Sequence, residues 1–106
     1  MKVLLLNSSI ITAEGTYELK DITLSEAKTL IEKQELDSAV GHQSTADVMT
    51  TLLAIKVGVD RKQVIQEAGQ IALVFKLNGR VEEGKILSIE EIEKIGYKFQ
   101  RLIRIK

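Results

Sequence analysis

The sequence contains a single histidine, His42, which stands in the stretch GHQST at the start of an expected helix. Imidazole titrates near neutral pH and can donate a proton to a leaving oxygen, so His42 is a candidate general acid. Gly41 permits close approach to the backbone, and Ser44 and Thr45 offer hydroxyl groups. A helix N-terminus adds unpaired N–H groups and the positive end of the helix dipole. This stretch therefore predicts a phosphate site with a proton donor at its rim.

The same stretch also has plainer interpretations. Ser44 and Asp47 have the spacing of a capping box, so Ser44 could simply cap the helix, and His42 could be an ordinary surface histidine. A bound phosphate would favour the protonated imidazole, whereas the helix dipole disfavours it. Taken alone, GHQST leaves both interpretations open.

A second polar cluster is the stretch NGRVEEGK. Arg80 could hold a phosphate with two parallel hydrogen bonds, and Glu83 could orient a ribose hydroxyl or act as a base. A solvated charged loop is the alternative. Two further candidates are Arg61, as a cation, and the stretch NSS after the first apolar run, where Asn7 and Ser8 could donate hydrogen bonds to a base or a sugar.

Composition limits the possible functions of the 106-residue chain. It has no cysteine and one histidine, which argues against a disulfide scaffold or a Cys- or His-ligated metal, so we expect no metal and no cofactor. The net charge of zero argues against coating duplex DNA, and an aromatic content of 4% argues against a stacking-based single-strand binder. No apolar run is long enough to span a membrane. We expect a cytoplasmic protein, with residues 1–106 forming one domain.

Hydrophobic periodicity predicts the elements that must position these residues. We expect strands at 2–6, 15–22, 36–40 and 97–105, and a hairpin whose two strands cover 61–66 and 70–77. Capping boxes predict helices that begin at Thr23, Ser44 and Ser88, the second ending near Gly58 and the third at Gly96. The expected fold is α/β: a single domain with a mixed β-sheet of about five strands flanked by about three α-helices.

Read in order, LNSS, VGHQST and RVEEGKIL resemble motifs of the viral ring nucleases, over essentially the whole chain. These are type III anti-CRISPR proteins of archaeal viruses and bacteriophages, with relatives in prokaryotic genomes. The resemblance implies a homodimer that binds cyclic tetra-adenylate, the messenger of type III CRISPR defence, at the dimer interface. It implies metal-independent cleavage, in which a ribose 2′-hydroxyl attacks the adjacent phosphorus. The product would be linear di-adenylate with a 2′,3′-cyclic phosphate.

The resemblance also implies roles for individual residues. His42 would be the general acid that protonates the departing 5′-oxygen, and Glu83 and Arg80 would lie near the scissile phosphate. The ligand-binding positions would be Asn7, Ser8, Gly41, Ser44, Thr45 and Arg61. The stretch SSIITAEG after the first strand is more like that of phage and bacterial members than the longer loop of some archaeal viral members.

Three other functions compete with this one. The chain could bind cyclic oligoadenylate without cleaving it, acting as a sponge for the messenger. It could be a small viral nucleic-acid-binding protein, which steep salt dependence of duplex binding would reveal. A metal-dependent nuclease is the weakest alternative, because the sequence lacks a compact aspartate cluster.

Overall fold

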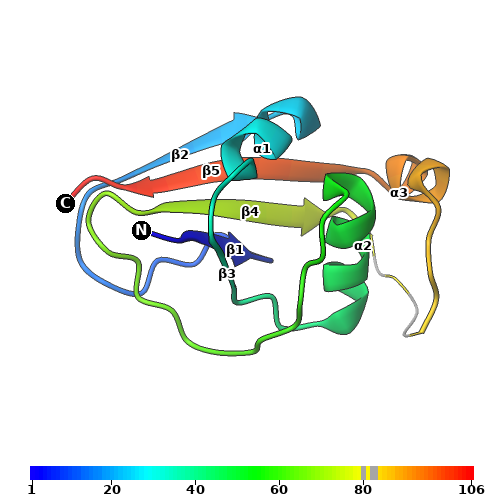
Figure 1. Cartoon of the computed structure of the whole chain (residues 1–106), viewed down its shortest axis with the longest axis horizontal. Helices are drawn as coiled ribbons and strands as arrows, with labels where there is room; N and C mark the ends of the chain where they lie inside the picture. The colour runs from blue at the N-terminus through cyan, green and yellow to red at the C-terminus, as the bar shows by residue number, and fades with distance from the viewer. Residues whose placement is uncertain (80, 82–83) are drawn as a thin grey trace.

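The computed structural model describes residues 1–79, 81 and 84–106, drawn in Figure 1. The elements in chain order are β1 (Val3–Leu6), β2 (Tyr17–Ile22), α1 (Leu24–Ile31), β3 (Leu36–Ser38), α2 (Gln43–Leu53), β4 (Ile71–Leu77), α3 (Ile89–Ile95) and β5 (Tyr97–Arg104). The predicted fold class is confirmed: one mixed five-stranded sheet carries three helices.

Strand β1 lies inside the sheet, whose order is β2-β5-β4-β1-β3. It pairs in parallel with β3 on one side and β4 on the other, while β5 runs antiparallel to β4 and β2. All four residues of β1 are buried, as expected for an apolar strand covered on both faces. Because β1, β3 and β4 are parallel, their carboxyl ends meet at one edge of the sheet, which we call the carboxyl edge.

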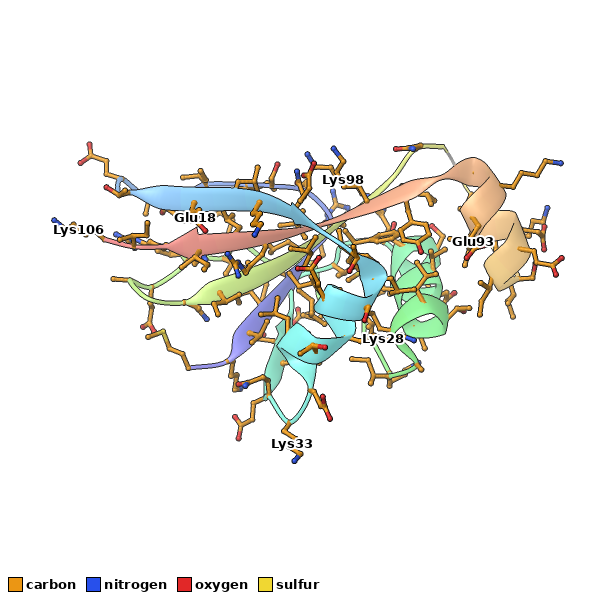
Figure 2. All side chains as sticks on the ribbon, turned by 90° about the horizontal axis from the view of Figure 1, so that it is seen from above. Glu18, Lys28, Lys33, Glu93, Lys98 and Lys106 are labelled. Atoms are coloured by element: carbon orange, nitrogen blue, oxygen red, sulfur yellow. The ribbon has the colours of Figure 1, made fainter. Side chains whose placement is uncertain are left out.

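The two faces of the sheet are covered differently. On the helical face, Leu5 and Phe75 pack in one cluster with buried residues of all three helices, including Ala27, Met49 and Ile92. Figure 2 shows α1 and α2 on the same side of the sheet. The opposite face carries a smaller cluster, made of Leu4, Leu6, Ala39, Ala72, Val74 and Leu102. Two segments, 7–16 and 59–70, contribute residues that pack against or line a cavity over this second face, which we call the loop face.

Two of the predicted capping boxes are present. Thr23 and Glu26 exchange hydrogen bonds at the start of α1, and Ser88 and Glu91 do so at the start of α3. Hydrogen bonds from the backbone N–H groups of Thr23 and Ser88 lower the pKa values of the Glu26 and Glu91 carboxyl groups. Gly96 ends α3 as predicted, in a conformation with φ of 89°.

The predicted hairpin is wrong, because residues 61–66 form no strand. Both edges of β4 are already paired, one with β1 and one with β5, so a preceding strand has no place beside it. The segment instead crosses the loop face. Buried Gln66 donates hydrogen bonds to the carbonyl oxygens of Gln70 and Leu102, and these fix its end.

The predicted end of the second helix is also wrong. Helix α2 stops at Leu53, and Ala54 adopts a left-handed conformation with φ of 58°. The Thr50 hydroxyl accepts a hydrogen bond from the Val57 amide at 3.0 Å, so the chain has already turned back before Gly58. The strand predicted at 36–40 is shorter than expected and ends at Ser38.

Helix α3 offers a matched test of this packing. Ile92 is fully buried against the helical face, whereas Ile89 on the same helix is 51% exposed. We expect Ile92→Val to lower the free energy of unfolding by about 0.5–1.5 kcal/mol, because it leaves a methyl-sized void in the core. Ile89→Val should change it by less than about 0.5 kcal/mol. Urea denaturation measures both, and equal losses would contradict the docking of α3.

Candidate functional site

The candidate site lies at the carboxyl edge, where polar residues follow three neighbouring parallel strands. Asn7 and Ser8 follow β1, and Gly41 and His42 stand between β3 and α2. The segment after β4 begins with Asn78. In open α/β sheets, ligands bind beyond the carboxyl ends of strands whose connections leave toward opposite faces. Strands β1 and β3 meet this condition, because segment 7–16 lies over the loop face and α2 covers the helical face.

The aliphatic stem of Arg61 lies beside Gly41, although the two residues stand twenty positions apart in the sequence. A Cβ atom added to Gly41 would sit 3.4 Å from the Arg61 Cγ atom. The Asp60 amide donates a hydrogen bond of 3.0 Å to the Val40 carbonyl, which aligns the two segments. Arg61 is exposed and forms no salt bridge with any residue that the structure describes. The stem that carries its guanidinium group thus lies beside the GHQST stretch.

Ser38 and Lys62 hold the segment that carries Arg61. The Ser38 hydroxyl donates to the Gly58 carbonyl at 2.6 Å and accepts from the Val40 amide at 3.3 Å. The Lys62 ammonium forms salt bridges of 2.5 Å with Asp37 and 3.2 Å with Asp60. The hydrogen bonds to Asp37 and then Asp60 raise the pKa of Lys62.

These contacts were absent from the sequence-based interpretation, because they join residues about twenty or more positions apart. Opposite charges at Asp37 and Lys62 were the available signal, but the sequence offers many such pairs.

His42 occupies the N-cap position of α2, with extended backbone angles φ −131° and ψ 133°. The capping box predicted for Ser44 and Asp47 is wrong: the helix begins one residue before Ser44, and Asp47 instead accepts a hydrogen bond of 2.8 Å from Gln43. The His42 side chain does not cap the helix. Among the described residues, the first-turn amides therefore receive no side-chain acceptor, which suits an incoming anion.

The structure brings most of the predicted site residues to one edge of the sheet. Asn7 and Ser8 line a cavity together with Lys62, the neighbour of Arg61, and Ser44 and Thr45 lie half-buried in the first turn of α2. Arg80 and Glu83 lie outside the described residues. Within residues 1–79, 81 and 84–106, no three His, Cys, Asp or Glu side chains gather as a metal site. No helix in these same ranges has the length and hydropathy needed to cross a membrane.

Comparison with known proteins identifies the family. The model of the STIV B116-like family matches residues 3–99. The chain belongs to this family. Uncharacterized protein 26 of Sulfolobus islandicus filamentous virus (isolate Iceland/Hveragerdi) is 38% identical over 85 residues, 79% of this chain and 72% of the relative. Uncharacterized protein YddF of Bacillus subtilis (strain 168) is 34% identical over 107 residues and 99% of both chains. Relatives of this chain thus occur in a virus and in a bacterium.

A solved structure shares the fold over almost the whole chain. B116 of Sulfolobus turreted icosahedral virus superposes with a TM-score of 0.86 at 25% sequence identity, and the match covers 98% of this chain and 100% of that one. The five-stranded mixed sheet with three helices is therefore the fold of this STIV B116-like chain.

Ser38→Ala tests whether the Ser38 hydroxyl positions the Arg61 segment. Loss of its two hydrogen bonds should lower the free energy of unfolding by about 1 kcal/mol. The Asp60 amide, which bonds to Val40, should exchange its hydrogen faster by roughly fivefold or more as the segment loosens. Amide exchange followed by NMR measures this. Ser25→Ala, at an exposed position on α1, is the control, and unchanged Asp60 exchange in Ser38→Ala would contradict the positioning role.

Proposed function

We propose that the chain is a metal-independent ring nuclease that binds cyclic tetra-adenylate and cleaves it to linear di-adenylate with a 2′,3′-cyclic phosphate. The observation that carries this proposal is the approach of the Arg61 side-chain stem to Gly41, the residue before His42 at the start of α2. In this proposal the Arg61 guanidinium group, the first-turn amides of α2 and the His42 imidazole act on one phosphate. The resemblance of VGHQST and RVEEGKIL to viral ring nuclease motifs supports the same activity.

The proposed reaction needs no nucleophile from the protein. The ribose 2′-oxygen attacks the adjacent phosphorus, the bond from phosphorus to the 5′-oxygen breaks, and the His42 imidazolium gives its proton to that oxygen. The 2′-hydroxyl loses its own proton to a base, a role that we assign to Glu83. Holding the three reacting atoms in line can contribute up to about 7–11 kcal/mol of the barrier, and a positioned acid typically about 10²–10⁴-fold in rate.

Charge stabilisation at the phosphate would come from fixed groups. Arg61 and the first-turn amides of α2 would supply positive charge at the carboxyl edge, and Arg80 would add a second guanidinium group from the RVEEGKIL motif. Ser44 and Thr45 would hold neighbouring phosphate oxygens. Such preorganised donors stabilise the charge that develops as the bond to the leaving oxygen breaks.

We propose that the active form is a homodimer with the ring at its interface. A ring of four adenylates has a symmetry that a twofold dimer can match, so each chain would present one copy of the site to each half of the ligand. One histidine per chain then suffices for two cuts. The protein would act in the cytoplasm of a prokaryotic cell, where removal of the messenger antagonises type III CRISPR signalling.

His42→Ala tests the catalytic step. In excess EDTA, the wild-type protein should convert cyclic tetra-adenylate to di-adenylate, and His42→Ala should be slower by roughly 10²–10⁴-fold, because the leaving oxygen lacks its proton donor. Chromatography of the products measures this.

Gln34→Ala, at an exposed position just before β3 and away from the carboxyl edge, is the matched control and should retain full activity. Recovery of the intact ring after incubation with the wild-type protein would contradict the proposed ring nuclease activity. If the intact ring is nevertheless bound tightly, the protein is a messenger sponge.

Arg61→Ala tests the phosphate contact separately from the chemistry. In a His42→Ala background, which keeps the ring intact, Arg61→Ala should weaken binding of cyclic tetra-adenylate roughly 10- to 100-fold, since a charged hydrogen bond is lost. Arg61→Lys should recover part of the affinity, and Lys28→Ala on α1 is the control cation. Isothermal titration measures all four proteins. Equal affinities for the Arg61→Ala and Lys28→Ala proteins would remove Arg61 from the site.

A further inference from the structure

A cavity of about 200 Å³ lies on the loop face, between the two segments that cross it. Leu6 and Ala39 belong to its apolar lining on the sheet side, and Ile11 of segment 7–16 and Val64 of segment 59–70 line it from the two crossing segments. The Thr12 hydroxyl donates a hydrogen bond of 2.5 Å to the Val64 carbonyl, which joins the two segments. In Figure 1 both segments run back to the left end of the sheet, at which β2 and β4 begin. We call this cavity the slot.

The slot reaches the carboxyl edge through residues that follow β1. Asn7 and Ser8, which follow β1 at the carboxyl edge, are among its lining residues. Lys62 also lines it and is the chain neighbour of Arg61, whose stem lies beside Gly41. A ligand held at the carboxyl edge would therefore have the Asn7 and Ser8 end of the slot beside it.

Chemistry of the slot walls suits a flat apolar group with polar edges. Ile11 and Val64 offer aliphatic surface, while the amide group of Gln63 supplies both a donor and an acceptor and has no hydrogen-bond partner among the described residues. Lys62 has its charge paired with Asp37 and Asp60, so the slot itself carries no free cation from that residue. These features select against a second phosphate and for a neutral heteroaromatic ring.

We propose that the slot binds an adenine base of the ring, with its apolar walls on the base faces and Asn7, Ser8 and Gln63 at its polar edges. This inference rests on the proposed function, since the base is one carried by cyclic tetra-adenylate. It adds a recognition element that the phosphate site alone lacks: Arg61 and the helix amides hold any phosphodiester, whereas the slot holds the base. Seating the base also fixes the rotation of its nucleotide, which the in-line attack requires.

A titration with mononucleotides tests the slot without relying on cleavage. Adenosine 5′-monophosphate should shift the methyl NMR signals of Ile11, Ala39 and Val64 in the wild-type protein. Ribose 5-phosphate, which lacks the base, should leave these signals in place. The methyl group of Ile105, which is 51% exposed and outside the slot, serves as an internal control. Slot methyl groups that respond equally to both compounds, or to neither, would overturn the inference.

Ile11→Ala provides the kinetic test. Ile11 is 54% exposed, and Ile105→Ala is a control of nearly equal exposure away from the slot. If the base packs on Ile11, Ile11→Ala should raise KM for cyclic tetra-adenylate roughly tenfold while kcat stays within about twofold, because apolar contact area is lost on binding. If Ile11→Ala changes KM no more than Ile105→Ala does, the inference that the slot binds the base is wrong.

Failure of the slot and failure of the proposed function give different results. If the protein cleaves the ring but adenosine 5′-monophosphate does not shift the slot methyl signals, the proposed enzyme activity stands and the proposed base site is wrong. If adenosine 5′-monophosphate shifts the slot methyl signals but the protein leaves the ring intact, the proposed base site stands and the proposed enzyme activity is wrong. Ala39→Leu, which fills the cavity from its floor, should abolish the mononucleotide shifts and provides a second variant if Ile11→Ala is unstable.

Discussion

Parallel pairing on both sides of β1 is the constraint on which the rest of the molecule depends. Since β3 and β4 take both of its edges, the chain cannot return beside β1 through a short hairpin and must cross over a face of the sheet. The three carboxyl ends therefore open at one edge. Segment 7–16 leaves toward the loop face and α2 toward the helical face, and in open α/β sheets ligands bind at such a point.

Local pairing of charges decides which cations remain for a ligand. The chain has equal numbers of acidic and basic residues, so its overall field attracts no polyanion. Neighbouring cations at the carboxyl edge nevertheless differ: Lys62 is held by Asp37 and Asp60, whereas Arg61 makes no salt bridge to a described residue. Lys62 thus helps to fix the backbone of segment 59–70. In the proposed function, the phosphate contact is made by Arg61 and not by Lys62.

The sequence allowed prediction of whatever depends on local spacing. The capping boxes at Thr23 and Ser88, the buried first strand and the α/β class all follow from residues a few positions apart. Prediction failed where a long-range partner decided the outcome. Residues 61–66 contain branched residues typical of a strand, but both edges of β4 are already paired. Ser44 has the spacing of a cap, although His42 takes that position. The same reasoning missed Ser38, whose partner Gly58 lies twenty residues away.

A metal-independent self-cleavage suits what this architecture does well. The largest requirement of such a reaction is that the 2′-oxygen, the phosphorus and the leaving oxygen stay in line. A rigid edge of parallel strands, one phosphate contact at Arg61 and one base contact in the slot would restrain a nucleotide at both ends, which fixes that angle without any reactive group. The exposed His42 then needs only to reach the leaving oxygen. Because a proton donor contributes less than alignment, the restraint on the nucleotide, and hence the depth of the slot, should govern which rings are cleaved.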